Sequence, residues 1–225
     1  MALTKVIGAG LGTVTEDQVF GGATPTVTIG DAGAEDAKIV FDGNAQDYHI
    51  GLDDSADTLV IGKGSALGTT TSMSIDANGI ITKPLQPAFL SGTSRVTNIT
   101  GDGTSYAATA ATWTDIYDQN LDFSNGTFTA PVAGKYNFTF VLTLAGTAAN
   151  HANATFSLIG SNRTTTYYNA PGVDRNTSLG GTTYVLTTNL DMDASDTMHL
   201  AFAVDGGNKT VVLYELSRFS GFLVC

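Results

Sequence analysis

Cysteine, charged residues and basic clusters are all scarce in this 225-residue chain. The single cysteine, Cys225, is the last residue, so a disulfide framework and a cysteine-based metal site are both excluded. Only 14% of the residues are charged, and the 10 Lys and Arg form no run. Because a surface that binds duplex nucleic acid needs clustered basic side chains to replace counterions, we expect no nucleic-acid partner.

Long apolar runs are also missing. No stretch reaches the roughly 18 continuous apolar residues of a membrane-spanning helix, so we expect no membrane insertion. Residues 1–8 lack a charged segment followed by an apolar one, and we therefore expect no secretory signal. The lack of cysteine pairs fits assembly in a reducing cytoplasm.

The chain is rich in small and apolar residues and carries excess acid. Apolar side chains make up 42% of it, 26 residues are glycine, and the net charge is −11. This is the composition of an ordered protein. Glycine and threonine are abundant, whereas helix formers such as glutamate, glutamine and lysine are scarce, which favours short strands and turns and predicts an all-β fold.

Three zones follow one another along the chain. Residues 1–34 are a Gly/Thr/Ala-rich lead-in. In residues 35–83, strand-like segments alternate with turn dipeptides, and Asn78-Gly79 is a strong hairpin signal. This zone has too few large apolar groups to offset its chain entropy alone, and self-association would supply the missing contacts. We therefore predict an intertwined, oligomeric β stalk.

A stiff connector at residues 84–88 contains Pro84 and Pro87, and residues 89–225 beyond it are richer in aromatics. In the clearest strand, 136–144, apolar side chains alternate with polar ones, so one face is buried. A second alternation covers 198–204. Two packed antiparallel sheets, in a sandwich or jelly roll, are the expected outcome.

One set of residues in this zone resembles the signature of the complement C1q-like globular head: Leu121, Phe128, Gly134, Tyr136, Phe138 and Phe140, with the closing run Phe219–Val224. The resemblance implies a TNF-like jelly roll that forms a homotrimer. It also implies that Phe128, Tyr136, Phe138 and Phe140 fill the core. By the same resemblance, Phe219, Phe222 and Val224 would lie near the trimer axis.

The N-terminal zones resemble a different group of proteins. Segments 38–44 and 50–57 are similar to the N-terminal regions of short fibre proteins of marine tailed bacteriophages. No collagen-like Gly-X-Y repeat precedes the head, which argues against a complement-type secreted protein. The resemblance implies a virion appendage assembled in the host cytoplasm. Its partners would be its own copies, other virion proteins bound through residues 1–34, and a host-surface glycan or protein.

No motif indicates catalysis or a cofactor. The three histidines, His49, His151 and His199, are far apart and do not form a metal-ligand spacing. The glycines at 8, 10 and 12 do not complete a dinucleotide fingerprint, because Thr13 stands where the third glycine belongs. We therefore expect neither an enzyme nor a bound cofactor.

Two groups of residues are candidate binding sites, one for calcium and one for a receptor. Asp191, Asp193 and Asp196 are weak calcium candidates, and we expect them to be solvated turn residues instead of a metal site. Tyr167, Tyr168, Arg175 and Asn176 lie in the segment 163–181, which together with 151–153 we interpret as tip loops. Such side chains suit recognition of glycans or proteins, so these four are the receptor-binding candidates.

Together these observations favour a virion structural protein: a short homotrimeric tail or head fibre that adheres to a host surface. A capsid decoration protein that stabilises the particle is an alternative. A secreted bacterial C1q-like binding module is another, and it would need an export signal. A hydrolase acting on surface polysaccharide ranks last, because it would need a paired-carboxylate groove at a subunit interface.

Overall fold

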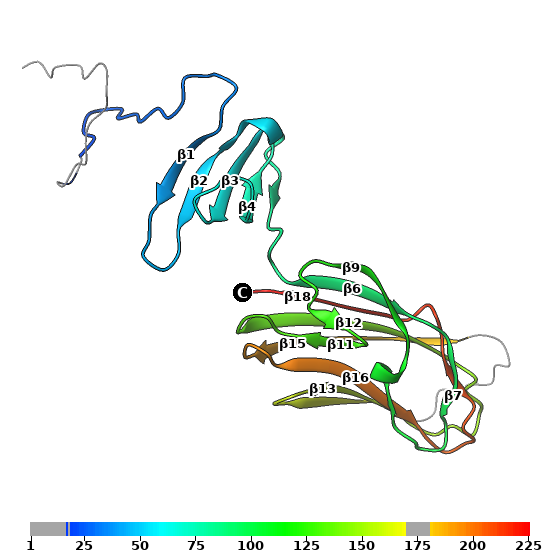
Figure 1. Cartoon of the computed structure of the whole chain (residues 1–225). Coiled ribbons are helices and arrows are strands. Elements are labelled where there is room, and N and C mark those ends of the chain that lie inside the picture. Colours follow the sequence, from blue (N-terminus) through cyan, green and yellow to red (C-terminus); the bar gives the residue numbers. More distant parts are fainter. Residues whose placement is uncertain (1–16, 18, 170–180) are drawn as a thin grey trace, which may run out of the picture.

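The computed structural model describes residues 17, 19–169 and 181–225 and shows two β units joined by a short connector (Figure 1). A five-stranded sheet is followed by a two-sheet sandwich, which we call the head. The described helices are two three-residue 3-10 turns, Asp54–Ala56 and Ala108–Ala110. None of the described helices has the length and apolarity needed to cross a membrane. The prediction of an all-β fold is confirmed.

The N-terminal sheet is an antiparallel meander in which each strand pairs with the next one along the chain. Its strands are β1 (Ala37–Phe41), β2 (Tyr48–Asp53), β3 (Thr58–Lys63), β4 (Thr71–Ile75) and β5 (Ile81–Thr82). The turn before β5 contains the expected Asn78-Gly79 pair. The Asp76 carboxylate accepts hydrogen bonds from the backbone N–H groups of Asn78 and Ile80, and Gly79 has a φ of +80°. All five strands pair within one chain.

The head consists of a seven-stranded and a six-stranded sheet. In the seven-stranded sheet the order is β7-β17-β12-β18-β6-β9, and β15 pairs with β12. Its strands are β6 (Ala88–Thr93), β7 (Val96–Thr100), β9 (Trp113–Asp118), β12 (Gly134–Ala145), β15 (Thr182–Met192), β17 (Val211–Leu213) and β18 (Arg218–Leu223).

In the six-stranded sheet the order is β10-β11-β16-β13-β14, and β8 pairs with β16. Its strands are β8 (Tyr106–Ala107), β10 (Phe123–Ser124), β11 (Thr127–Thr129), β13 (Ala154–Gly160), β14 (Thr164–Asn169) and β16 (Thr197–Val204). All strand pairs in both sheets are antiparallel. Figure 1 shows the two sheets lying against each other, with the connector and the C-terminus at the same end of the head.

The core lies between these two sheets and is built largely of aromatic rings. Along β12 every second side chain from Tyr136 to Leu144 points inward and is buried, as the alternation predicts. The β16 residues Met198, Leu200, Phe202 and Val204 face them from the other sheet and are also buried. Phe128, Tyr136, Phe138 and Phe140 are at most 1% exposed, so all four fill the core.

Phe219 also belongs to this core. Its ring stacks on Phe140 with 3.7 Å between centroids, and the side chain is fully buried within a single chain. A side chain with no exposed surface cannot contribute to a contact between subunits. The expectation that Phe219 offers apolar surface at a trimer axis is therefore corrected: it lies in the core, where its ring also meets Phe123 of the six-stranded sheet with 5.5 Å between centroids.

Candidate interaction surfaces

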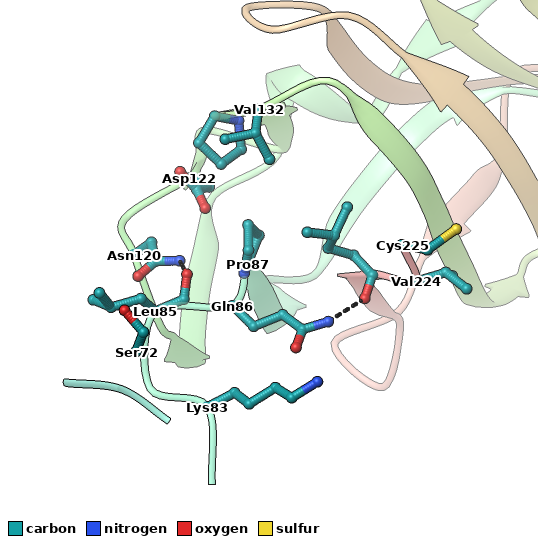
Figure 2. A pocket seen from close by; sticks show the side chains of 12 residues that line it. Ser72, Lys83, Leu85, Gln86, Pro87, Asn120, Asp122, Val132, Val224 and Cys225 are labelled. Atoms are coloured by element: carbon teal, nitrogen blue, oxygen red, sulfur yellow. Dashed lines mark hydrogen bonds between the residues drawn. The ribbon is translucent and has the colours of Figure 1, made fainter. Parts of the chain in front are cut away.

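A hollow of about 750 Å³ lies where the connector meets the head (Figure 2). Three side-chain amides fix the backbone there. Gln119 donates to the Lys83 carbonyl (2.7 Å), Asn120 donates to the Leu85 carbonyl (3.0 Å), and Gln86 donates to the Leu223 carbonyl (2.8 Å). The walls are mainly apolar and are formed by Leu85, Pro87, Pro131, Val132, Leu223 and Val224.

Asp122 places a carboxyl group in this hollow. One of its oxygens, Oδ2, is buried and has no hydrogen-bond partner. Burial, followed by repulsion from Asp118, raises the pKa of Asp122 above its ordinary value. Asp118 itself is held by the backbone, because its two oxygens accept from the N–H groups of Asp122 and Phe123. The hollow can accept an apolar group, with a carboxyl group at its margin.

The face of the seven-stranded sheet that points away from the core is the second surface, and we call it the outer face. It is defined by three rows across the strands: Val185, Val141, Arg218 and Gly92; Thr187, Thr139, Ser220 and Leu90; and Asn189, Asn137, Phe222 and Ala88. In two of these rows the β12 and β15 side chains bond to each other. Asn137 donates to Asn189 (2.8 Å), and the Thr139 and Thr187 hydroxyls are 3.2 Å apart.

Charge is nearly absent from the outer face. Arg218 is the one ionised side chain in its three rows, and its guanidinium donates to the backbone carbonyls of Glu215 and Ser217. Large apolar side chains remain open to solvent: Val185 is 64% exposed and Phe222 49%. The face thus combines paired hydroxyl and amide groups with uncovered apolar ones. A surface of this composition can pack against an uncharged partner, and the one charge that it would cover, on Arg218, is hydrogen-bonded to backbone carbonyls.

The receptor-binding candidates lie at the end of the head away from the connector, or outside the described residues. Tyr167 and Tyr168 belong to β14, not to a loop, so the expectation of one continuous loop over 163–181 is wrong. The run of threonines and tyrosines favours strand pairing, and β14 pairs with β13 in register from Ile159↔Thr164 to Ala154↔Asn169. Tyr167 is half-buried and packs against the core. Arg175 and Asn176 lie outside the described residues.

Polar loops at the same end are tied together by hydrogen bonds. His151 is buried; its Nδ1 accepts from the Ala148 N–H (2.7 Å), so its Nε2 carries the proton and donates to the Asn208 carbonyl (3.0 Å). The Asn153 side chain donates to both carboxylate oxygens of Asp205. His151 therefore connects two loops, 147–153 and 205–210, and both of its ring nitrogens are occupied.

The calcium candidates do not converge on a cation. Asp196 accepts hydrogen bonds from the Ser161 hydroxyl (2.7 Å), the Asn162 amide and the Asp193 backbone N–H. The hydrogen bonds from Ser161 and Asp193 lower the pKa of Asp196. Asp191 and Asp193 are exposed. In the part of the chain that the structure describes, no three His, Cys, Asp or Glu side chains are arranged to hold a metal ion.

Two features of these surfaces escaped the sequence analysis. The junction hollow depends on the polar run 118–122, whose Asp, Gln and Asn side chains bond to the backbone; a cluster of such residues directly after a strand was the available signal. The outer face depends on β15. Its alternation of exposed Thr183, Val185, Thr187 and Asn189 has the same period of two that identified β12.

Comparison with known proteins gives similarity of fold only. No protein-family model matches the sequence, and no curated protein matches it as a relative. Among solved structures, the globular domain of zebrafish complement 1qA protein is 20% identical, with 62% of this chain and 98% of that one covered and a TM-score of 0.42. Murine APRIL is 10% identical, with coverage of 61% and 99% and a TM-score of 0.40. Rabbit GITRL is 13% identical, with coverage of 61% and 94% and a TM-score of 0.37.

Proposed function

We propose that this chain is a bacteriophage virion protein: a short homotrimeric fibre, attached through residues 1–34, that displays its head for adhesion to a host surface. The supporting observation is the outer face, whose three rows hold one charged side chain, Arg218, and leave Val185 and Phe222 uncovered. Burial of such a face between copies removes apolar surface from water, and the single charge it covers keeps its hydrogen bonds to the backbone carbonyls of Glu215 and Ser217. The proposal of a bacteriophage protein rests on segments 38–44 and 50–57, which resemble the N-terminal regions of short fibre proteins of tailed bacteriophages.

The positions of the connector and of the loops at opposite ends of the head support the display of those loops to a host surface. The connector enters the head near Leu223 and Cys225, where β12 begins at Gly134. Asn169, the end of β14, and Thr182, the start of β15, lie at the opposite end, next to Ala154 and Leu144 respectively, and Ala154 pairs with Val204 on its other side. The C-terminal end of β14 and the loops joined by His151 would therefore lie at the end of the head away from the attachment point.

Adhesion in this proposal is multivalent. Each head contributes one weak site, and three heads on a fibre, with many fibres on a particle, raise the overall avidity without strong individual contacts. Binding, not catalysis, is the function.

Two experiments test the proposal. An antiserum against the purified protein, applied with a gold label to phage particles from the culture that carries this gene, should mark appendages. Uniform label over the capsid would favour the decoration protein instead, and unlabelled particles would contradict a virion protein.

In the second experiment, host cells are incubated with the purified protein before phage is added. Occupied receptors should reduce phage adsorption. A variant that remains folded but monomeric should compete far less well, because avidity is lost with the trimer. Unchanged adsorption with saturating wild-type protein would contradict the adhesive role.

A further inference from the structure

One face of the N-terminal sheet is apolar across all five strands. The strand registers align Ile39 of β1 with Ile50 of β2, Ile50 with Ile61 of β3, and Ile61 with Met73 of β4. The neighbouring row joins Leu52, Leu59, Ile75 and Ile81 in the same way. Because paired residues point to the same side of a sheet, these side chains share one surface, which we call the apolar face.

The apolar face has no cover within the chain. Ile39 is 44% exposed, Leu52 45% and Ile81 58%. Ile29 in the lead-in lies beside it, across a shallow hollow of about 240 Å³, but Ile29 is itself 47% exposed. The head lies on the other side of the connector in Figure 1. The described part of the chain therefore leaves this face to solvent.

The opposite face of the same sheet is already filled. It carries His49, Gly51, Val60 and Gly62, and all four are buried. The segment 64–70 covers them: a Cβ atom on Gly51 would lie 2.8 Å from Leu67 Cδ1, and the His49 ring bonds to the Gly64 carbonyl (2.8 Å). The centre of this face is thus closed by the chain itself and the face is exposed at its edges, as at Val40, whereas the apolar face is open over its whole width.

A sheet in this state is not stable alone. Val60 is the one fully buried hydrophobic residue in β1 to β5. Three or more strands need a covered hydrophobic face for independent stability, since one side chain offsets little of the entropy lost on ordering. The partner that covers the apolar face must therefore be present whenever the chain folds. A second copy of the same chain meets that condition.

Charge and size also point to another copy. Residues 37–82 contain six aspartates, and none lies in the two rows of the apolar face. Copies that carry a net charge of −11 repel one another elsewhere, yet the two apolar rows can meet without like charges facing each other. Lys63, which pairs with Tyr48 in the next row of the same side, is exposed at the margin. Five strands with a spacing of ~4.8 Å make a flat area of a few hundred Å², the size at which exposed apolar patches mark interaction sites.

We infer that the apolar face packs against the same face of the other copies, so that three N-terminal sheets enclose a common hydrophobic interior. The number three rests on the homotrimer of the proposed function. In this inference each copy keeps its own five strands, which pair within one chain, and the copies meet by their faces. It differs from the intertwined stalk expected from the sequence, which stays a prediction.

Cross-linking of the full-length protein tests this inference. In a Cys225→Ser background, Ile61→Cys puts a thiol at the centre of the apolar face. Val40→Cys is the control and puts a thiol on the opposite face of the sheet. The two positions are matched in exposure, since Val40 is 37% exposed and Ile61 is 36% exposed. A short bismaleimide should join Ile61→Cys chains in dilute solution and leave Val40→Cys chains single. Ile39→Cys, next to Val40 and on the apolar face, repeats the test if Ile61→Cys does not fold.

The mass of each variant in solution separates the possible failures. A trimer that cross-links through position 61 or 39 and not through position 40 supports the inference. A trimer that cross-links at none of these positions, or equally at all of them, overturns the inference and leaves the homotrimer of the proposed function standing. A monomeric mass overturns both.

Discussion

Phe219 and Leu121 are both part of the C1q-like pattern, yet they contribute very differently to the fold. Phe219 has no exposed surface, whereas Leu121 is 87% exposed with a φ of +59°, and Phe123, two residues later, fills the core. Phe219→Ala should lower the free energy of unfolding by about 3–5 kcal/mol because it leaves a cavity between the sheets. Urea unfolding followed by the fluorescence of Trp113, the single tryptophan, measures this loss.

Leu121→Ala is the matched control and should change the free energy of unfolding by less than about 0.5 kcal/mol. Equal losses for Phe219→Ala and Leu121→Ala would show that Leu121 is buried in solution, for example by another subunit.

The Asp196 carboxylate contributes to stability in a way that depends on pH. Its pKa lies below the ordinary value of 3.8 because Ser161 and the Asp193 N–H bond to the ionised form. A lowered pKa means that this contribution is fully present above pH 3.8 and is lost as the pH falls through the lower, folded-state value. We expect Asp196→Asn to lower the melting temperature at pH 7, and the difference from the wild type to shrink below pH 3.8.

Thermal unfolding from pH 7 down to pH 3 checks this prediction. Asp191→Asn is the control, since the Asp191 side chain is exposed and accepts no hydrogen bond in the described residues. A constant difference between Asp196→Asn and the wild type over the whole range would contradict the assignment. Calcium should not raise the melting temperature of the wild type.

At the scale of elements, the hairpin between β10 and β11 depends on its two turn residues. Asn125 and Gly126 have φ values of +49° and +76°, which suit a tight two-residue turn. A Cβ on Gly126 would also clash with the indole nitrogen of Trp113, which donates to the Ala108 carbonyl (2.8 Å). Gly126→Ala should therefore combine backbone strain with a clash.

Gly64→Ala isolates the backbone strain. Gly64 has a φ of +89° and open space around it, so this variant should cost about 1 kcal/mol of unfolding free energy. Gly126→Ala should cost clearly more, as measured by urea unfolding. Equal losses would show that the Trp113 ring moves aside without cost.

Elements were predictable from the sequence where local rules suffice. The alternation in 136–144 and the dipeptide Asn78-Gly79 correctly predicted β12 and the turn before β5. The burial of Phe219 instead of its exposure at an axis was not predictable, because β18 has a phenylalanine on each face and its pairing with β12 decides which face turns inward. The junction hollow brings together residues from 72 to 225, and no local pattern carries such a contact.

On the scale of the whole molecule, the outer face should decide the oligomeric state. Val185→Glu would place a carboxylate from each copy on the outer face. The one cation in its row, Arg218, is two strands away and already bonds to backbone carbonyls, so burial of the new charge is costly. We expect this variant to remain folded and to lose most of its trimer, as measured by light scattering after size exclusion. Thr166→Glu, at an exposed position of the six-stranded sheet, should leave the trimer intact. Equal behaviour of the two variants would move the subunit contact away from the outer face.

The most direct test of the central claim is the mass of the full-length wild-type protein in solution. The account predicts three times the chain mass of 23.3 kDa, unchanged on dilution, because both the outer face and the apolar face are covered by other copies. A folded protein with the mass of one chain would contradict it, since these two apolar surfaces would then remain open to water.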